Sequence, residues 1–166
     1  MGTIEQINVT PIKKYHFIIG KLVPFYLLSI VVFTIGLFIA YAFYGVFPVG
    51  SFGTLFAGVF VYLFALIGFG LLLSTYSETQ QQVMSLAFFF LNILNMMSGL
   101  FTNLDSMPEW AKFVTYCFPV SHFIKVMRMV MVRGSSLIDV SHHLVYMFVI
   151  GLIFNVWAVL NYRKRS

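Results

Sequence analysis

The first feature of the chain is a long apolar stretch, from Leu22 to Ser77, that contains no Asp, Glu, Lys or Arg. One membrane-spanning helix needs about 20 apolar residues, so this stretch is long enough for two. Gly45, Pro48 and Gly50 lie near its middle and favour a turn. The pattern therefore predicts two transmembrane helices, over residues 22–43 and 52–75, joined by a short loop.

Two further apolar segments follow, over residues 83–101 and 144–160. Between them, residues 105–134 are divided by Pro119 into pieces of about twelve residues, which are too short to span a membrane. Residues 1–21 are polar to amphipathic and basic at their end. The predicted fold class is an all-α membrane protein: four transmembrane helices, an N-terminal amphipathic cytoplasmic segment and an extracytoplasmic re-entrant helical hairpin.

Composition and charge agree with a membrane protein and indicate its orientation. Only 9% of the residues are charged and 60% are hydrophobic, whereas soluble domains carry about 25% charged residues. Basic residues flank the first and last spans: Lys13, Lys14, Lys21, Arg163, Lys164 and Arg165. By the positive-inside rule both ends are cytoplasmic. Because membrane orientation accounts for the +5 net charge, we expect no nucleic-acid partner. The predicted outer hairpin carries four cations of its own, which the same rule opposes: Lys112, Lys125, Arg128 and Arg133.

A polar stripe runs along the predicted third span. Its members share one helical face, because they are spaced 7, 3 and 4 residues apart: Ser85, Asn92, Asn95 and Gly99. We expect this stripe to face the interior of the helix bundle rather than lipid. Two interpretations stay open, hydrogen bonding between helices or the lining of a translocation path.

A cationic stripe lies on the second half of the hairpin, where His122, Lys125 and Arg128 follow one another at intervals of three. Long cationic side chains at such positions commonly extend toward the membrane interface. The stripe is therefore either an edge that faces solvent or headgroups, or a ligand-binding surface.

Catalytic chemistry is not indicated. The chain has no phosphate-binding G-x-x-x-x-G-K-[ST] motif. The predicted spans contain no ionisable Asp, Glu, Lys, Arg or His, which disfavours an intramembrane protease or a proton-coupled transporter. His142 and His143 are adjacent rather than four apart, and Cys117 is the only cysteine, so no metal site is expected. The sequence indicates a conduit or moving part rather than an enzyme, with its energy source elsewhere.

Several short motifs, in order, resemble one family. The segment Gly2–Pro11 (GTIEQINVTP) resembles the cytoplasmic coupling segment of permeases of type-2 ATP-binding-cassette (ABC) exporters. Further resemblances lie at 20–24, at 74–75 with 79–82, at 98–101 with 107–110, and at 118–122. Each motif is weak alone, but their order and spacing along almost the whole chain are specific.

The resemblance implies a mechanism and its partners. Coupling to a separate ATPase subunit would involve these residues: Gly2, Thr3, Glu5, Gln6, Thr10 and Pro11. An extracytoplasmic gate would involve the hairpin residues Pro108, Trp110, Pro119, His122 and Arg128. ATP and magnesium would bind the partner subunit, with no cofactor in this chain. The permease would work as a dimer with a second copy or a homologue, in the lipid bilayer of the bacterial inner membrane.

Permeases of this family are expected to have six spans, with the coupling segment after the second. This sequence predicts four, so it corresponds to the C-terminal part of such a domain: a fragment, a chain with a misassigned start, or half of a split permease. Phe-rich walls with Met84, Met96 and Met97 suit a hydrophobic or amphiphilic substrate. The alternative function is a non-transporting membrane scaffold or assembly subunit, which would show no dependence on nucleotide.

Overall fold

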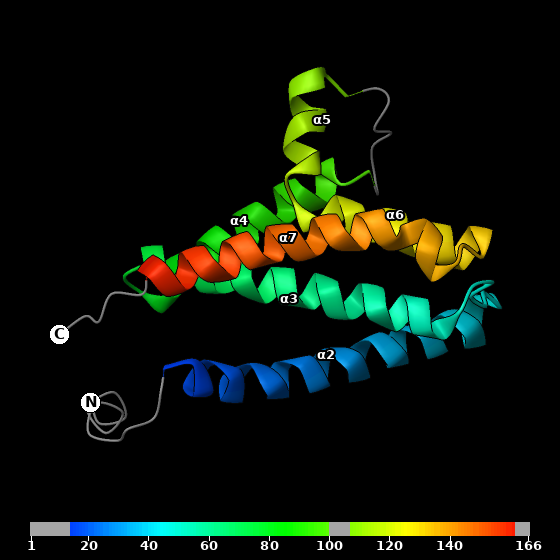
Figure 1. Ribbon diagram of the computed structural model, residues 1–166, viewed down its shortest axis with the longest axis horizontal. Coiled ribbons are helices and arrows are strands. Elements are labelled where there is room, and N and C mark those ends of the chain that lie inside the picture. The colour runs from blue at the N-terminus through cyan, green and yellow to red at the C-terminus, as the bar shows by residue number, and fades with distance from the viewer. Residues whose placement is uncertain (1–13, 100–106, 162–166) are drawn as a thin grey trace. The chain divides into compact units, whose positions relative to one another are not determined.

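A computed structural model describes residues 14–99 and 107–161, with side chains from residue 23 onward. These residues form six helices and no strand (Figure 1): α2 (Lys14–Tyr44), α3 (Phe52–Tyr76), α4 (Gln80–Met97), α5 (Glu109–Tyr116), α6 (Pro119–Arg133) and α7 (Leu137–Asn161). The all-α prediction is therefore confirmed over the described ranges. The chain divides into two compact units, Met1–Gly45 and Val46–Ser166.

The first unit contains α2, which is one continuous helix. The sequence predicted an interfacial segment that runs into a span starting at residue 22, and the apolar part of α2, Val23–Tyr44, corresponds to that span. Pro24 lies inside the helix rather than in its first turn. A proline there cannot donate the helical hydrogen bond to residue 20, but helices in membranes tolerate such a position.

In the second unit, side-chain caps decide where the helices begin. Ser51 caps α3 by accepting a hydrogen bond from the Gly53 backbone N–H at 3.2 Å. Thr79 does the same for α4, accepting from the Gln82 N–H at 3.2 Å. For this reason α4 begins at Gln80 rather than at residue 83, and it ends at Met97 rather than at 101.

The last helix also begins earlier than predicted, at Leu137 rather than at residue 144. Asp139 Oδ2 accepts hydrogen bonds from the Ser136 backbone N–H and the Ser136 hydroxyl, both at 2.8 Å. Serine followed three residues later by an acidic residue is a capping pattern, here placed ahead of the apolar run. The helix consequently includes His142 and His143, which the prediction had left outside a span.

Three described helices are long and apolar enough to cross a membrane, at Val23–Tyr44, Phe52–Tyr76 and Leu137–Asn161. These correspond to the first, second and last predicted spans. The predicted third span corresponds to α4, which has 18 residues and is therefore about 27 Å long. It is not among the three, so the fourth span stays a prediction.

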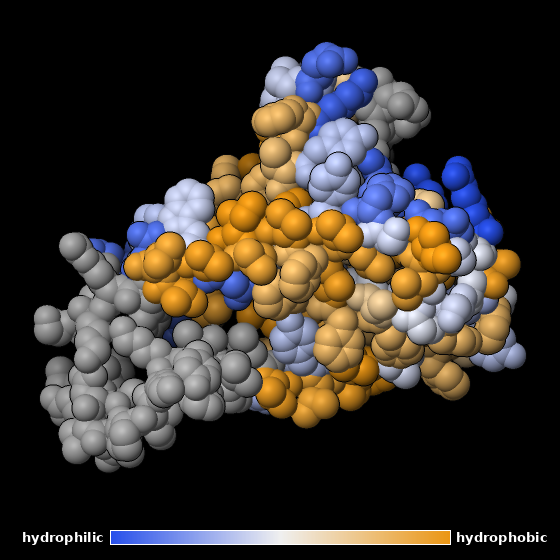
Figure 2. All heavy atoms as spheres, in the orientation of Figure 1, coloured by the Kyte–Doolittle hydropathy of each residue, from blue (hydrophilic) through white to orange (hydrophobic). Residues whose placement is uncertain are grey.

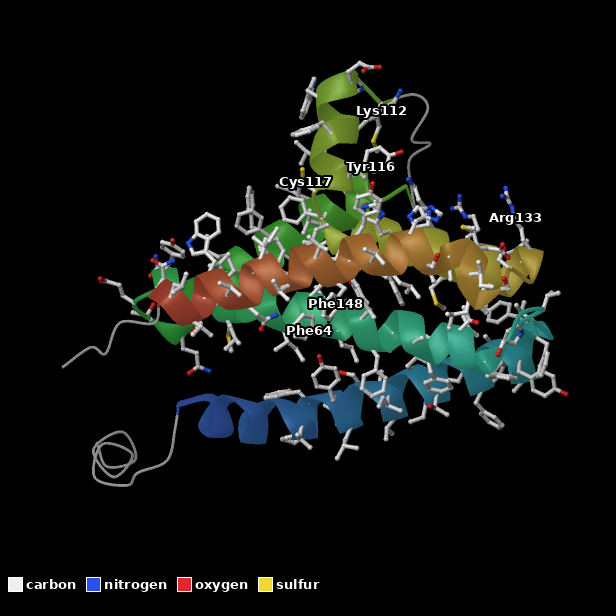
Figure 3. The ribbon with its side chains drawn as sticks, in the orientation of Figure 1. Phe64, Lys112, Tyr116, Cys117, Arg133 and Phe148 are labelled. Atoms are coloured by element: carbon white, nitrogen blue, oxygen red, sulfur yellow. The ribbon has the colours of Figure 1, made fainter. Side chains whose placement is uncertain are left out.

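The core of the second unit lies where α3, α6 and α7 meet. Its fully buried side chains come from these three helices: Leu55, Val126, Val130, Val140 and Met147. In Figure 3 the labelled rings of Phe64 and Phe148 lie between α3 and α7, with their centroids 5.5 Å apart. Burial of branched aliphatic side chains at this junction holds the three helices together.

The predicted hairpin is present as two helices joined at a short corner. Phe118 precedes α6, and Pro119 occupies its first turn, where a proline is well tolerated. Gly134 ends α6 with φ +68°, as the Arg133–Gly134 sequence predicted. The helices have 8 and 15 residues rather than about twelve each. In Figure 1, α5 points away from the layer that α6 and α7 form.

Candidate functional site

The α5–α6 hairpin (Glu109–Arg133) contacts the C-terminal end of α4. The Thr115 hydroxyl lies 2.7 Å from the Ala111 carbonyl of its own helix and 3.1 Å from the Met97 carbonyl, and its one hydrogen is shared between them. Arg128 Nη2 donates to the Gly99 carbonyl at 3.4 Å. The last carbonyls of a helix have no partner within the helix, and a cation there also complements the helix dipole. One side chain from each arm of the hairpin therefore contacts the last residue of α4 or the turn that follows it.

The corner of the hairpin is held by a buried serine. The Ser121 hydroxyl lies 2.6 Å from the Thr115 carbonyl and 3.1 Å from the Phe118 carbonyl. Both Ser121 and Thr115 are buried. Figure 3 labels Tyr116 and Cys117 at this corner, where α5 meets α6. Because the corner bonds span both arms, α5 and α6 form one connected element.

His122 connects the hairpin to α7. Its ring is 3% exposed. Nε2 lies 3.1 Å from the Tyr116 carbonyl, and Nδ1 lies 3.1 Å from Nδ1 of His143. Its ring also stacks on Tyr146 of α7, with centroids 5.4 Å apart.

The surroundings of His122 favour its neutral form. Burial is the largest cause and lowers the pKa of His122, and the positive charges of Lys125 and His142 lower it further. The hydrogen bond to the Tyr116 carbonyl acts in the opposite direction but is the smaller influence. A neutral imidazole can accept one hydrogen bond while it donates another, as this geometry requires.

The three cationic-stripe residues contact three different parts of the chain rather than forming one free edge. His122 meets α7, and Lys125 Nζ lies 4.2 Å from the centre of the Tyr116 ring on α5. Arg128 reaches Gly99, in the turn just after α4. A cation over an aromatic face is attracted by the ring's quadrupole. The stripe therefore holds the hairpin in place, a role that the sequence interpretation did not include.

The predicted gate residues fall into two groups. Pro119 and His122 are buried at the base of the hairpin, and Arg128 lies on the same helix. Pro108, just before α5, and Trp110, on α5, are exposed, Trp110 by 69%. Figure 2 shows hydrophilic residues gathered over α5 and α6, in contrast to the mainly hydrophobic α7. The structure does not bring the gate residues together at one point.

The polar stripe on α4 does not face the interior of this chain's helix bundle, contrary to expectation. Ser85, Asn92 and Asn95 are exposed, whereas Leu94, on another side of the helix, is buried. The reason is that the apolar side of α4 packs inward, where the Phe90 ring lies 5.6 Å from that of Phe69 on α3. The stripe is left on the outer surface of the described chain.

Sequence reasoning missed one polar residue, Asn155 of α7. Its amide donates to the Phe64 carbonyl of α3 at 3.1 Å and to the Gly151 carbonyl at 2.8 Å. A single Asn in an otherwise apolar span is a signal of helix–helix hydrogen bonding. Asn155 could therefore have been predicted from the sequence to bond a neighbouring helix.

The predicted coupling residues, from Gly2 to Pro11, lie outside the described residues. Within the ranges that the structure describes, no group of three or more His, Cys, Asp or Glu side chains is placed to hold a metal ion.

Comparison with known proteins gives consistent matches. Residues 1–132 match the protein family described as "ABC-2 type transporter". The chain is 31% identical over 136 residues to "Probable multidrug ABC transporter permease YbhR" of Escherichia coli (strain K12), covering 82% of this chain and 37% of that protein. It is 29% identical over 166 residues to "Inner membrane transport permease YhhJ" of the same strain, covering 98% of this chain and 44% of that protein.

The chain thus spans less than half the length of these relatives. No solved structure gives a significant match. The family match extends over most of the chain and includes residues 2–11, where the sequence resemblance was found. The helices long enough to cross a membrane agree with it. The chain therefore belongs to the ABC-2 type transporter family of membrane permeases.

Proposed function

We propose that this chain is the C-terminal part of the membrane domain of an ATP-driven ABC exporter. It would move a hydrophobic or amphiphilic substrate out of the cytoplasm, across the bacterial inner membrane. The family match over residues 1–132 carries this proposal. The names of two relatives, one a "multidrug" permease and one an "inner membrane" permease, support the substrate class and the location.

The energy would come from a separate ABC ATPase that binds ATP and magnesium. The segment 2–11 would dock on this ATPase, with Gly2, Thr3, Glu5 and Gln6 in the docking part and Thr10–Pro11 at its end. Both chain ends would then be cytoplasmic, and the α5–α6 hairpin would lie on the opposite side. Four spans with a re-entrant hairpin fit this orientation, although α4 is the shortest of the proposed spans.

The permease would work as a dimer, with a second copy or a homologue. The exposed stripe of Ser85, Asn92 and Asn95 supports this arrangement, because polar side chains on a membrane helix are costly unless they face a partner or a water-filled path. The hairpin contacts both α4 and α7. It could therefore transmit a movement of either helix to an outer gate.

The coupling role predicts a loss of ATPase association on charge reversal. In a chain co-expressed with an ABC ATPase encoded beside its gene, Glu5→Arg should reduce co-purification and remove the permease's effect on ATP turnover. The matched control is Glu109→Arg, the same substitution at the exposed start of α5, which should leave both unchanged. Equal association of both variants with the ATPase would contradict the coupling assignment. Association that is insensitive to nucleotide would instead favour a membrane scaffold.

A further inference from the structure

The contact between the hairpin and α7 is a pair of imidazole rings. Nδ1 of His122 and Nδ1 of His143 lie 3.1 Å apart, although the residues are 21 positions apart in sequence. His122 is 3% exposed, and His143 is half-buried at the surface. The pair therefore lies at the junction of the two elements, with one ring inside and one partly open to the outside.

The hydrogen positions of this pair follow from its acceptors. The Tyr116 carbonyl can only accept, so Nε2 of His122 carries the hydrogen that bridges their 3.1 Å separation. In the neutral ring Nδ1 then has a lone pair, and His143 must donate its Nδ1–H to it. His143 Nε2 remains able to take one more proton without breaking this bond.

A second added proton cannot be accommodated. It would have to bind His122 Nδ1, which would then place two N–H groups against each other across 3.1 Å. The contact is therefore compatible with a neutral pair or a singly charged pair, and incompatible with two imidazolium rings.

The charged and titratable groups around the pair oppose positive charge. Lys125 of α6 and His142 of α7 act on His122 as positive charges. The phenol rings of Tyr116 and Tyr146 also face it, at 5.9 and 5.4 Å between centroids. Nothing in these contacts supplies a negative charge to the ring.

Groups on the neighbouring turns and helices are already engaged elsewhere. The Asp139 carboxylate, one turn before His143, accepts two hydrogen bonds from Ser136. On α3, the Tyr62 ring stacks on Phe123, with centroids 4.1 Å apart. The sequence of α4 contains no titratable residue.

We propose that His122 and His143 form a proton-sensitive latch between the outer hairpin and α7. With at most one of the rings protonated the latch holds the hairpin on α7, and with both protonated it releases it. The ligand of this site is the proton of the aqueous phase on the hairpin's side. This inference goes beyond the transport function and depends only on contacts within the described chain.

The direction of the pH effect follows from the burial of His122. Burial lowers the pKa of His122 in the docked hairpin, whereas a released, solvated His122 would return to about 6.5. Release therefore takes up a proton as the pH falls below about 6.5, and docking is complete above it. Between the two pKa values, each pH unit changes the released-to-docked ratio by up to about tenfold for each proton taken up.

Distance measurements between two spin labels test the latch. Cys117 is the only cysteine of the chain and lies exposed at the hairpin corner. The second label is placed by Ile138→Cys on α7, where Ile138 is 80% exposed. In nanodiscs of a phosphatidylethanolamine–phosphatidylglycerol mixture, we expect one short-distance population at pH 7.5 and a second, longer one at pH 5.0. The change should reverse on return to pH 7.5.

Three variants separate the latch from general acid damage. His143→Asn keeps an amide that can donate or accept but cannot be protonated, so it should stay docked at both pH values. His143→Leu removes the donor and should be released at both. The matched control, His142→Asn, leaves the pair intact but removes one of the groups that lower the pKa of docked His122, so it should still release, at a lower pH than the parent. Helix content by circular dichroism confirms that each variant is folded.

Several outcomes would overturn the proposal. The parent chain could show no pH-dependent change, or His143→Asn could respond to pH as the parent does. Loss of the docked population on adding EDTA at pH 7.5 would instead show that a metal ion joins the two rings.

Discussion

At the scale of single residues, glycines and one asparagine set how closely α3 and α7 approach. A Cβ on Gly151 would lie 2.9 Å from the Ala65 Cα and 2.9 Å from Cδ1 of Phe64. A Cβ on Gly68 would collide with the side-chain amide of Asn155. Asn155 in turn bonds the Phe64 carbonyl across the interface. Small residues at one crossing thus allow a polar side chain to reach the backbone of the other helix.

This close approach predicts a position-specific effect of adding one methyl group. Gly151→Ala should lower the free energy of unfolding by about 1–3 kcal/mol, because the opposing contact is backbone and cannot move aside. The matched control is Gly70→Ala on α3, where an added Cβ meets nothing within 4 Å. We expect that control to be neutral or slightly stabilising, since Ala favours a helix over Gly.

The thermal midpoint of helix loss in detergent micelles, followed by circular dichroism, measures both variants. Equal midpoints for Gly151→Ala and Gly70→Ala would show that α3 and α7 are not in close contact at this crossing.

At the scale of elements, the hairpin behaves as a clamp on the end of α4. Thr115 of α5 bonds the carbonyl of Met97, the last residue of that helix, and Arg128 of α6 bonds the carbonyl of Gly99 just after it. Ser121 joins the two arms. Each arm alone is too short to span a membrane or to form a stable isolated helix. Its order therefore depends on these contacts with its neighbours.

The clamp predicts that one hydroxyl group controls the protection of α5. Thr115→Val keeps the shape of the side chain but removes the hydroxyl, which bonds the Met97 carbonyl of α4 and the Ala111 carbonyl of α5. A lost hydrogen bond costs about 1 kcal/mol, which corresponds to about a fivefold faster amide hydrogen exchange in α5. Thr75→Val is the control, because the Thr75 hydroxyl bonds only its own helix, at the Leu72 carbonyl. If both variants raise exchange in α5 equally, the clamp does not depend on Thr115.

At the scale of the whole molecule, the polar face of α4 lies on the outer surface, and packing within a single chain does not explain it. The apolar side of the helix is used inside the bundle, and the Asn92 side chain bonds the Phe88 carbonyl of its own helix, at 2.7 Å. In a permease dimer this face would meet the second copy, which agrees with the proposed function.

Disulfide cross-linking tests that arrangement. With Cys117→Ser as background, Asn92→Cys should form a disulfide-linked dimer in native membranes when an oxidant is added. Ile93→Cys, which is 38% exposed but points at least about 100° away from Asn92 and Asn95 of the polar face, should form little. Equal yields from the two positions would show that α4 does not present its polar face to a second copy.

The sequence by itself determined the helical class, the three helices that are long and apolar enough to cross a membrane, and the break at Pro119. It also determined the αL end of α6 at Gly134 and the family. These depend on local properties: the length of apolar runs, proline's missing donor, glycine's tolerance of positive φ, and linear motifs. The early start of α7 was readable too, since Ser136 and Asp139 form a capping pattern.

Only the tertiary structure decided which way each face points. The contacts of the hairpin join residues distant in sequence: Thr115 with Met97, 18 positions away, and His122 with His143, 21 positions away. Asn155 and Phe64 are 91 positions apart. The rotation of a helix about its axis follows from how its small and apolar residues pack on neighbours. Sequence spacing therefore identified the residues of the polar stripe and of the cationic stripe. Packing placed the polar stripe on the outer surface of the chain and gave each residue of the cationic stripe a different contact.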